Sequence, residues 1–166
     1  MRKFIFVVLF TPLFLQAQKI KVSVEVKSLR QYCGGARPSE EIEKEYSTPQ
    51  AHNGAIFLIV KDKKIVATVK TNELGTFKCK LKKGSYQVFE SWRYTLQTPN
   101  NLDFGMFDKT CLIKEWERAY GELEVDSKSF RFKELYPIIK LCDWSLPCLN
   151  VEVPVPPSAP PPGREQ

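Results

Sequence analysis

Residues 19–27, KIKVSVEVK, alternate strictly between apolar and polar side chains, and no other feature restricts the fold of this chain as strongly. Ile and Val occupy every even position, whereas Lys, Ser and Glu occupy every odd position. A period of two residues is typical of a β-strand that buries one face and exposes the other to solvent. The segment therefore predicts a half-buried strand, and with it a fold that contains a sheet.

Four further strands follow closely in the middle of the sequence. They are AIFLIVK, KIVATVK, TFKCKL and SYQVFES, at residues 55–61, 64–70, 76–81 and 85–91. The first is apolar on both faces, as in a central strand that is covered on two sides. The connections are short and polar, and Gly75 supplies a residue that tolerates positive φ in one of them. This spacing predicts an antiparallel meander within an all-β sandwich or barrel.

Two short helices are expected among the loops. Ser39 can cap a helix over residues 40–46, whose first turn carries glutamates that the helix dipole favours. Residues 110–120, TCLIKEWERAY, have apolar residues at helical spacing. Between the strands and this second helix, residues 93–109 are rich in turn-forming residues and predict a long loop. Residues 121–127 and 128–144 return to a period of two, and Pro137 would confine the last strand to an edge or split it.

The two ends of the chain have compositions of their own. Residues 1–17 begin with Arg2 and Lys3 and continue as an apolar run, which is typical of a secretory signal peptide and too short to span a membrane. Residues 153–166 are rich in proline and predict a flexible tail. We therefore expect a signal peptide, one β-sandwich domain at residues 18–152, and export to the periplasm, the cell surface or the medium.

Five cysteines follow the expected signal peptide, and exported proteins use cysteines mainly in disulfides. In TFKCKLK, Cys79 alternates inward with Phe77 and Leu81, so we expect a buried, unreactive thiol there.

The remaining cysteines are Cys33, Cys111, Cys142 and Cys148, and they allow three ways of forming two disulfides. We favour Cys33 with Cys148 and Cys111 with Cys142. The short loop CDWSLPC also allows a bridge between its own two cysteines.

Residues 65–88, IVATVKTNELGTFKCKLKKGSYQV, resemble the carboxypeptidase regulatory-like family of prealbumin-like, or transthyretin-like, sandwiches. The positions that carry the resemblance are Thr71, Asn72, Gly75, Thr76, Phe77, Leu81, Gly84, Tyr86 and Val88. The resemblance implies an antiparallel prealbumin-like β-sandwich with one or two short helices in loop insertions. It implies little about function, because the fold serves many functions.

YCGGARPSEEIEKEY, CLIKEW, CDWSLPC and VPPSAPPP look similar to segments of exported Bacteroidetes-type proteins, mostly of unknown function, that carry this module alone. That likeness implies a secreted or periplasmic sandwich with additional loops and no known catalytic residue.

A catalytic site has few candidates, because His52 is the only histidine. A dyad of His52 with Cys33 or Cys111 would make a Cys-dependent hydrolase, but a cysteine oxidised in an exported protein has no thiolate. The transthyretin-related hydrolases share the prealbumin-type fold but use several histidines and a C-terminal Tyr-Arg-Gly-Ser, which this chain lacks. We therefore expect no enzyme.

Metal sites and cofactors have equally little support. One histidine and no CxxC motif argue against zinc. Asp103 and Asp108, with Asn100 and Asn101, form an acidic loop, but their spacing matches no EF-hand. The glycines of CGGARP lack the context of a phosphate-binding loop and are expected in a tight turn beside a disulfide.

Aromatic side chains in loops are the remaining functional signal. Trp92, Tyr94, Trp116 and Trp144 could contact a sugar ring or a peptide, although a place in the core is the simpler interpretation. The net charge of +6 falls to about +4 without the expected signal peptide, and the lysines are scattered along the sequence rather than clustered in a stripe, which argues against nucleic acid as a partner.

The sequence thus favours a non-enzymatic exported module with a structural or binding role toward a protein, peptide or glycan. A glycan- or peptide-binding module that uses the loop aromatics is the first alternative, and a Cys-dependent hydrolase is the second.

Overall fold

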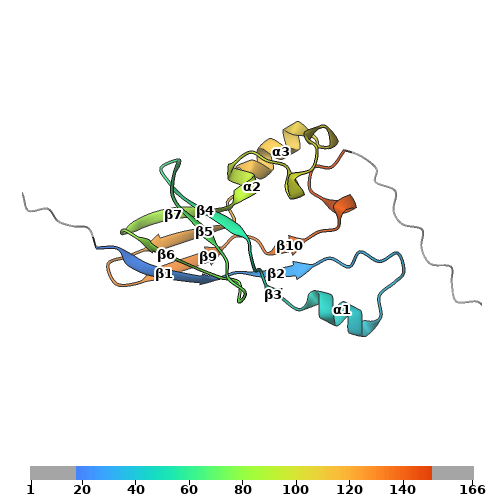
Figure 1. Cartoon of the computed structure of the whole chain (residues 1–166), viewed down its shortest axis with the longest axis horizontal. Coiled ribbons are helices and arrows are strands. Elements are labelled where there is room, and N and C mark those ends of the chain that lie inside the picture. Colours follow the sequence, from blue (N-terminus) through green and yellow to red (C-terminus); the bar gives the residue numbers. More distant parts are fainter. Residues whose placement is uncertain (1–17, 151–166) are drawn as a thin grey trace, which may run out of the picture.

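The computed structural model describes residues 18–150, and the expected signal peptide (1–17) and proline-rich tail (153–166) lie outside the described residues. The described part is an all-β sandwich of packed antiparallel sheets with three short α-helices, where we expected one or two (Figure 1).

A five-stranded antiparallel sheet forms one layer of the sandwich. Its strands, in spatial order, are β5 (Lys64–Lys70), β4 (Ile56–Lys61), β7 (Gly84–Glu90), β8 (Gly121–Val125) and β9 (Phe130–Glu134). The second layer is an antiparallel pair formed by β1 (Ile20–Glu25) and β6 (Thr76–Leu81).

The predicted meander is wrong in one respect, because β6 does not pair with β5. After β5 the chain turns at Gly75, whose φ is +71°, and crosses to the other layer, where β6 pairs with β1. It then returns at Gly84, and β7 pairs with β4. Turn residues and alternation predict where the strands lie, but not which strands pair. Pairing depends on which buried faces meet, and after a short turn β6 could join either layer.

The core lies between these two layers, and the alternation in β1 points into it. Val22, Val24 and Val26 are buried as expected. The largest fully buried side chains here include Phe57, Ile59, Phe77, Tyr120 and Leu123. The prediction that β4 is covered on both faces is also confirmed, since Leu58 and Val60 pack with Phe89 and Ala119 in a second cluster on the outer face of the sheet.

A third, small sheet extends from the end of the sandwich. It consists of β10 (Ile138–Lys140), β2 (Lys27–Arg30) and β3 (Gln50–Ala51), with β10 parallel to β2. The predicted strand at 19–27 therefore divides at Val26, whose amide donates to the carbonyl of Gly75 at the point where β6 begins. Pro137 splits the last strand as expected, because β9 ends before it and β10 begins directly after it.

The helices lie in the insertions. Helix α1 (Glu40–Ser47) starts at Ser39, whose hydroxyl accepts from the amide of Ile42, as predicted. The expected loop at 93–109 instead contains the end of α2 (Ser91–Tyr94) and the 3-10 turns η1 (Pro99–Asn101) and η2 (Phe104–Met106).

The helix predicted at 110–120 is shorter. It is α3 (Lys109–Trp116), with Leu112 buried but Ile113 exposed, and Tyr120 lies beyond it in the sandwich core. A third 3-10 turn, η3 (Asp143–Ser145), follows β10.

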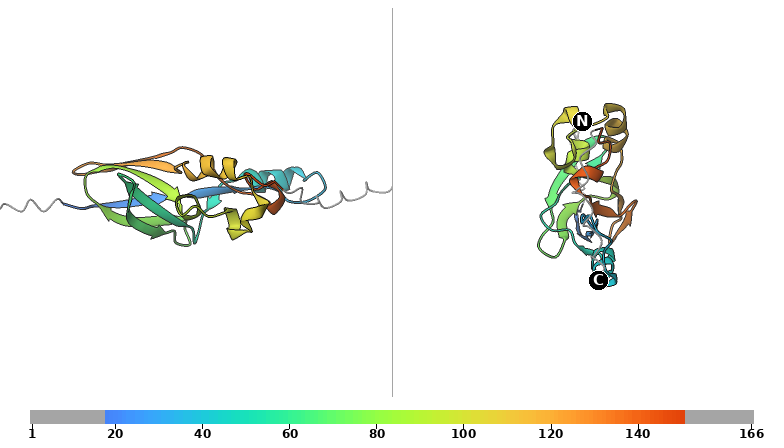
Figure 2. Two further views of the ribbon diagram at one scale, coloured as in Figure 1. Left: turned by 90° about the horizontal axis from the view of Figure 1, so that it is seen from above. Right: turned by 90° about the vertical axis from the view of Figure 1, so that its right-hand side faces the viewer.

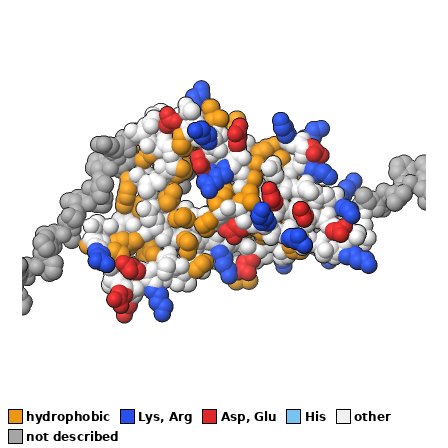
Figure 3. All heavy atoms as spheres, turned by 180° about the vertical axis from the view of Figure 1, so that it is seen from behind, with side chains coloured by type: hydrophobic (Ala, Val, Ile, Leu, Met, Phe, Trp, Pro, Cys, Tyr) orange, Lys and Arg blue, Asp and Glu red, His pale blue; other side chains and the backbone are white. Residues whose placement is uncertain are grey.

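The molecule is elongated, with the sandwich at one end and the helices and loops at the other (Figures 1 and 2). We call residues 91–118 and 141–150 the cap. Seen from behind, the surface exposes hydrophobic side chains in patches, with acidic and basic side chains interspersed (Figure 3).

Candidate functional site

Two disulfides hold the C-terminal part of the described chain. Cys33 is bonded to Cys142, which joins the loop after β2 to the start of η3, and Cys111 in α3 is bonded to Cys148. The expectation that these four cysteines are paired is confirmed, but the pairing we favoured is wrong. The glycines of CGGARP directly follow Cys33, and the chain bends at Gly35 without forming the tight turn that we expected there.

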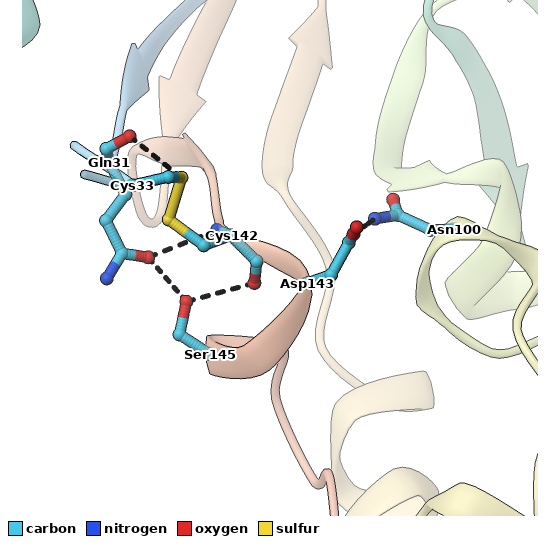
Figure 4. The surroundings of a disulfide bond; sticks show 6 residues. All are labelled: Gln31, Cys33, Asn100, Cys142, Asp143 and Ser145. Carbon is cyan, nitrogen blue, oxygen red and sulfur yellow. Dashed lines mark hydrogen bonds between the residues drawn. A yellow bond between two sulfur atoms is a disulfide. The ribbon is translucent and has the colours of Figure 1, made fainter. Parts of the chain in front are cut away.

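The surroundings of the first disulfide explain the pairing (Figure 4). The side-chain oxygen of Gln31 accepts from the amide of Cys142 at 3.3 Å and from the hydroxyl of Ser145 at 2.5 Å. The amide of Gln31 also donates to Lys140, so β2 and β10 run on together beyond their paired residues. This brings Cys33 to Cys142 and not to Cys148.

The second disulfide closes the cap. The amide of Asp108 donates to the carbonyl of Cys148 at 2.7 Å, and the amide of Asn150 donates to the carbonyl of Met106 at 2.8 Å. Asp108 also caps α3, since its carboxylate accepts from the amide of Cys111. The cap therefore has a small core of its own, with Phe107, Leu112 and Leu146 as its buried members.

Cys79 is the one free cysteine among the described residues, and it faces the core as predicted. It is half-buried rather than fully buried, and its burial raises the pKa of its thiol.

A cleft of about 720 Å³ opens where the cap meets the end of the sandwich. This volume lies within the range of roughly 300–1,000 Å³ that is typical of ligand pockets. One wall consists of residues 90–93, Pro99 and Asn100 and the end of α3, and the other of residues 136–141. Figure 1 shows α2 and α3 on one side of this region and β10 on the other. The lining is mostly apolar, with Ile56, Pro99, Pro137, Ile138, Ile139, Leu141, Leu146 and Pro147.

Arg93 holds together the wall of the cleft that the cap forms. Its side chain is 7% exposed, its Nε donates to Glu90 at 3.0 Å, and its Nη1 donates to both the carbonyl and the carboxylate of Glu115. Burial alone would lower the pKa of Arg93, but these acceptors outweigh it and the pKa is raised. Since Glu90 ends β7 and Glu115 lies in α3, the guanidinium joins the sandwich to the cap.

Two arginines cover the aromatic rings of the cleft. Arg93 lies 4.3 Å from the ring centroid of Trp92 and 5.3 Å from that of Tyr136, and Arg118 lies 4.1 Å from the centroid of Tyr136. The hydroxyl of Tyr136 donates to Glu90 at 3.4 Å. Burial, and then the charge of Glu90, raise the pKa of Tyr136. Arginine over an aromatic face contributes a cation–π interaction and removes that face as a platform for a sugar ring.

His52 lies at the edge of the cleft, on the side that the sandwich forms. Burial lowers its pKa, the nearby charge of Lys140 lowers it further, and Glu90 partly offsets both. Its Nδ1 is buried and has no hydrogen-bond partner among the described residues. The ring is therefore neutral at physiological pH, and Lys140 is left as an exposed cation of the cleft.

Of the aromatic residues that the sequence nominated, only Trp92 lines the cleft. Tyr94 packs on Phe89 over the outer face of the sheet, and its hydroxyl donates to the carbonyl of Lys63. Trp116 packs on Phe104 and donates to the carbonyl of Gln97. Trp144 is half-buried in η3, outside the lining of the cleft.

The proposed Cys–His dyad loses both of its thiols. Cys33 and Cys111 are bonded to other cysteines, and a disulfide has no thiolate to act as nucleophile.

The acidic loop likewise uses its side chains within the fold. The carboxylate of Asp103 accepts from the backbone amide of Gly105, Asp108 caps α3, and the side-chain amide of Asn100 donates to the carboxylate of Asp143. Within residues 18–150, no three His, Cys, Asp or Glu side chains come together as metal ligands would.

Sequence reasoning missed the ion cluster of Glu90, Arg93, Glu115 and Arg118. A signal for it exists, because the chain contains ESWR at 90–93 and EWER at 115–118, each with Glu and Arg three residues apart and a Trp between them. Spacing of i and i+3 places such pairs on one side of a helical turn. Only the fold shows that the two motifs meet.

Comparison with known proteins gives no relative: no family model, no curated protein and no solved structure matches the chain. None of the helices within residues 18–150 has the length and the apolar character needed to cross a membrane.

Proposed function

We propose that this chain is a non-catalytic, exported binding module of the carboxypeptidase regulatory-like kind, and that the cleft between sandwich and cap binds a peptide in extended conformation. The all-β sandwich and the two disulfides support this assignment, since disulfides persist mainly in exported proteins.

The open edge of β10 carries the proposal. Among the described residues, β10 pairs with β2 on one side and with no strand on the other. The carbonyl of Lys140 accepts from the amide of Gln31 beyond the end of β2, so the neighbouring Ile139 directs its own amide and carbonyl away from β2. Ile139 lines the cleft and is 46% exposed. An extended peptide can pair with such an edge and place alternate side chains in the adjacent pocket.

The walls of the cleft favour a peptide over a glycan. They are mainly apolar and proline-rich, which suits apolar side chains. A neutral sugar would need an accessible aromatic face and several polar partners, but Tyr136 is covered by Arg118 and Arg93. Lys140 and Arg118 favour a peptide that carries an acidic residue or its terminal carboxylate near the cleft.

The test is selection of a displayed random-peptide library on the oxidised protein, followed by calorimetric titration of the recovered peptides. We expect peptides with apolar residues at alternate positions and one acidic residue. Ile139→Pro removes the exposed amide and should weaken binding at least about tenfold, whereas Ile139→Val keeps the amide and should bind normally.

Trp92→Ala should also weaken binding, and Trp144→Ala, which changes a tryptophan outside the cleft, serves as its matched control. The proposal fails if the recovered peptides bind Ile139→Pro and Trp92→Ala as well as they bind the unaltered chain. Binding to a glycan array through Trp92 would instead support the glycan alternative.

A further inference from the structure

The exposed face of the β1–β6 pair gathers lysines that lie far apart in the sequence. Residues at odd positions of β1 and even positions of β6 point outward, and the register sets Lys21 directly opposite Lys80 and Ser23 opposite Lys78. We call this surface the lysine face, and its members are Lys19, Lys21, Lys78, Lys80 and Lys82, all of them exposed. The lysines are scattered along the sequence, but the pairing of β1 with β6 brings these five onto one surface.

These charges are not neutralised within the described chain. The one acid among the outward residues of β1 is Glu25, and it pairs with Lys27 at 3.2 Å. Lys83, which follows the lysine face, pairs with Asp126 at 2.7 Å. Among residues 18–150 none of the five lysines of the face forms an ion pair within 4.0 Å.

This arrangement works against the stability of the sheet. Like charges directly opposite each other across two strands repel, whereas a glutamate in place of Lys21 or Lys80 would attract its neighbour. Folding alone therefore does not call for five lysines on this face, and a ligand of opposite charge would relieve their repulsion.

We propose that the lysine face binds an acidic polysaccharide. The lysines form two rows along the strands, spaced about 7 Å apart because side chains on one face recur every second residue. A linear polymer with regularly repeated carboxylates matches such rows. Figure 1 shows β1 and β6 side by side along one side of the sandwich, away from α2 and α3, so this surface is separate from the peptide cleft.

Other polyanions fit this surface less well. The remaining outward residues of the two strands are Ser23, Glu25 and Thr76, and no aromatic or large apolar side chain stands among them. Proteins that bind single-stranded nucleic acid stack bases on aromatic residues, and proteins that lie on membranes insert apolar ones. The lysine face offers charge alone, as a carboxylated sugar chain requires.

The test is binding of the full exported chain to polygalacturonate at low and at physiological ionic strength. The triple variant Lys21→Gln, Lys78→Gln, Lys80→Gln is compared with Lys64→Gln, Lys70→Gln, Lys128→Gln, which removes the same net charge elsewhere. We expect the first to bind about a hundredfold more weakly at low salt, since each lysine near an anionic surface contributes about a factor of five, and the control to stay within about twofold. The triple variant Lys21→Arg, Lys78→Arg, Lys80→Arg keeps the positive charge and should retain binding.

Measuring the melting temperature of each variant distinguishes a loss of binding from a loss of folding. The glutamine triple on the lysine face should melt at the same temperature as the unaltered chain or higher, because it relieves repulsion. Equal losses in the two glutamine triples, or no binding of polygalacturonate at all, would overturn the proposal. So would tighter binding to an oligothymidylate or to phosphatidylglycerol vesicles than to polygalacturonate. Aggregation of the lysine-face triple with unchanged binding would show that the lysines only protect sheet edges, and would overturn it as well.

Discussion

The sandwich and the cap reach stability by different means. The sandwich buries a continuous cluster between two layers, including Phe57, Phe77 and Tyr120, and its one cysteine is free. The cap buries only a small cluster around Leu112, and the disulfide between Cys111 and Cys148 closes it. A segment with so few buried side chains gains little stability from the hydrophobic effect. The disulfides therefore contribute a larger share of the stability of the cap. The fold is therefore a sandwich with a continuous hydrophobic core that carries a covalently braced cap.

The largest expected effect comes from emptying the sandwich core. Phe77 is fully buried between the layers, so Phe77→Ala should lower the free energy of unfolding by about 4 kcal/mol. Urea denaturation measures it. Leu112→Ala, at an equally buried site in the cap, should chiefly raise hydrogen exchange in the cap and leave the strands protected. Equal global destabilisation by both variants would contradict a division into two regions.

The second effect concerns the junction between the regions. Arg93→Leu leaves the carboxylates of Glu90 and Glu115 near each other without their cation, which should cost about 3 kcal/mol. The control is Arg118→Leu, because this half-exposed side chain makes a weak 3.6 Å contact with Glu115 and a cation–π contact with Tyr136, and its loss should cost about 1 kcal/mol. Similar losses in the two variants, measured by urea denaturation, would show that Arg93 does not join the regions.

The third effect is confined to the cap. The pair Cys111→Ser and Cys148→Ser should favour local opening of the cap by about 2 kcal/mol, because the backbone bonds of Asp108 and Asn150 remain. Hydrogen exchange read by mass spectrometry should show faster exchange at 104–116 and unchanged exchange in β4 and β7. Cys79→Ala is the control and should change neither; loss of protection throughout the sandwich in the disulfide variant would refute the prediction.

The smallest effect is a pH dependence from His52. Burial lowers its pKa in the folded state, so the unfolded state binds the proton first as pH falls. Stability from the neutral ring is complete above pH 6.5 and is lost as pH falls from there toward the lowered pKa of the folded state. The slope should be well below the limit for one proton, about 1.4 kcal/mol per pH unit, because the ring is partly exposed. His52→Gln should flatten the stability profile between pH 7.5 and 5.5, and an unchanged profile would contradict it.

The same division explains what the sequence could predict. Strands and turns in the sandwich depend on local alternation and on residues such as Gly75, so β1, β4, β5, β6 and β7 were found near their observed limits. The pairing of β6 with β1 was not predicted, because pairing depends on contacts between segments that are distant in the sequence.

The cap was predicted poorly for the same reason. Its pairing of Cys33 with Cys142 follows from the register of β2 and β10, and the meeting of Glu90, Arg93 and Glu115 follows from how α2 and α3 pack. No local pattern encodes either arrangement. The lysine face shows the same limit, since Lys21 and Lys80 become neighbours only through strand pairing.

The most direct test of a disulfide-braced cap on the sandwich is peptide mapping of the protein by mass spectrometry, with and without reduction. The account predicts linked peptides for Cys33 with Cys142 and for Cys111 with Cys148, and a slowly alkylated free thiol at Cys79. A link from Cys142 to Cys148, or a reduced Cys33 or Cys111 that alkylates rapidly, would contradict the structure of the cap and with it the peptide binding proposed for the cleft.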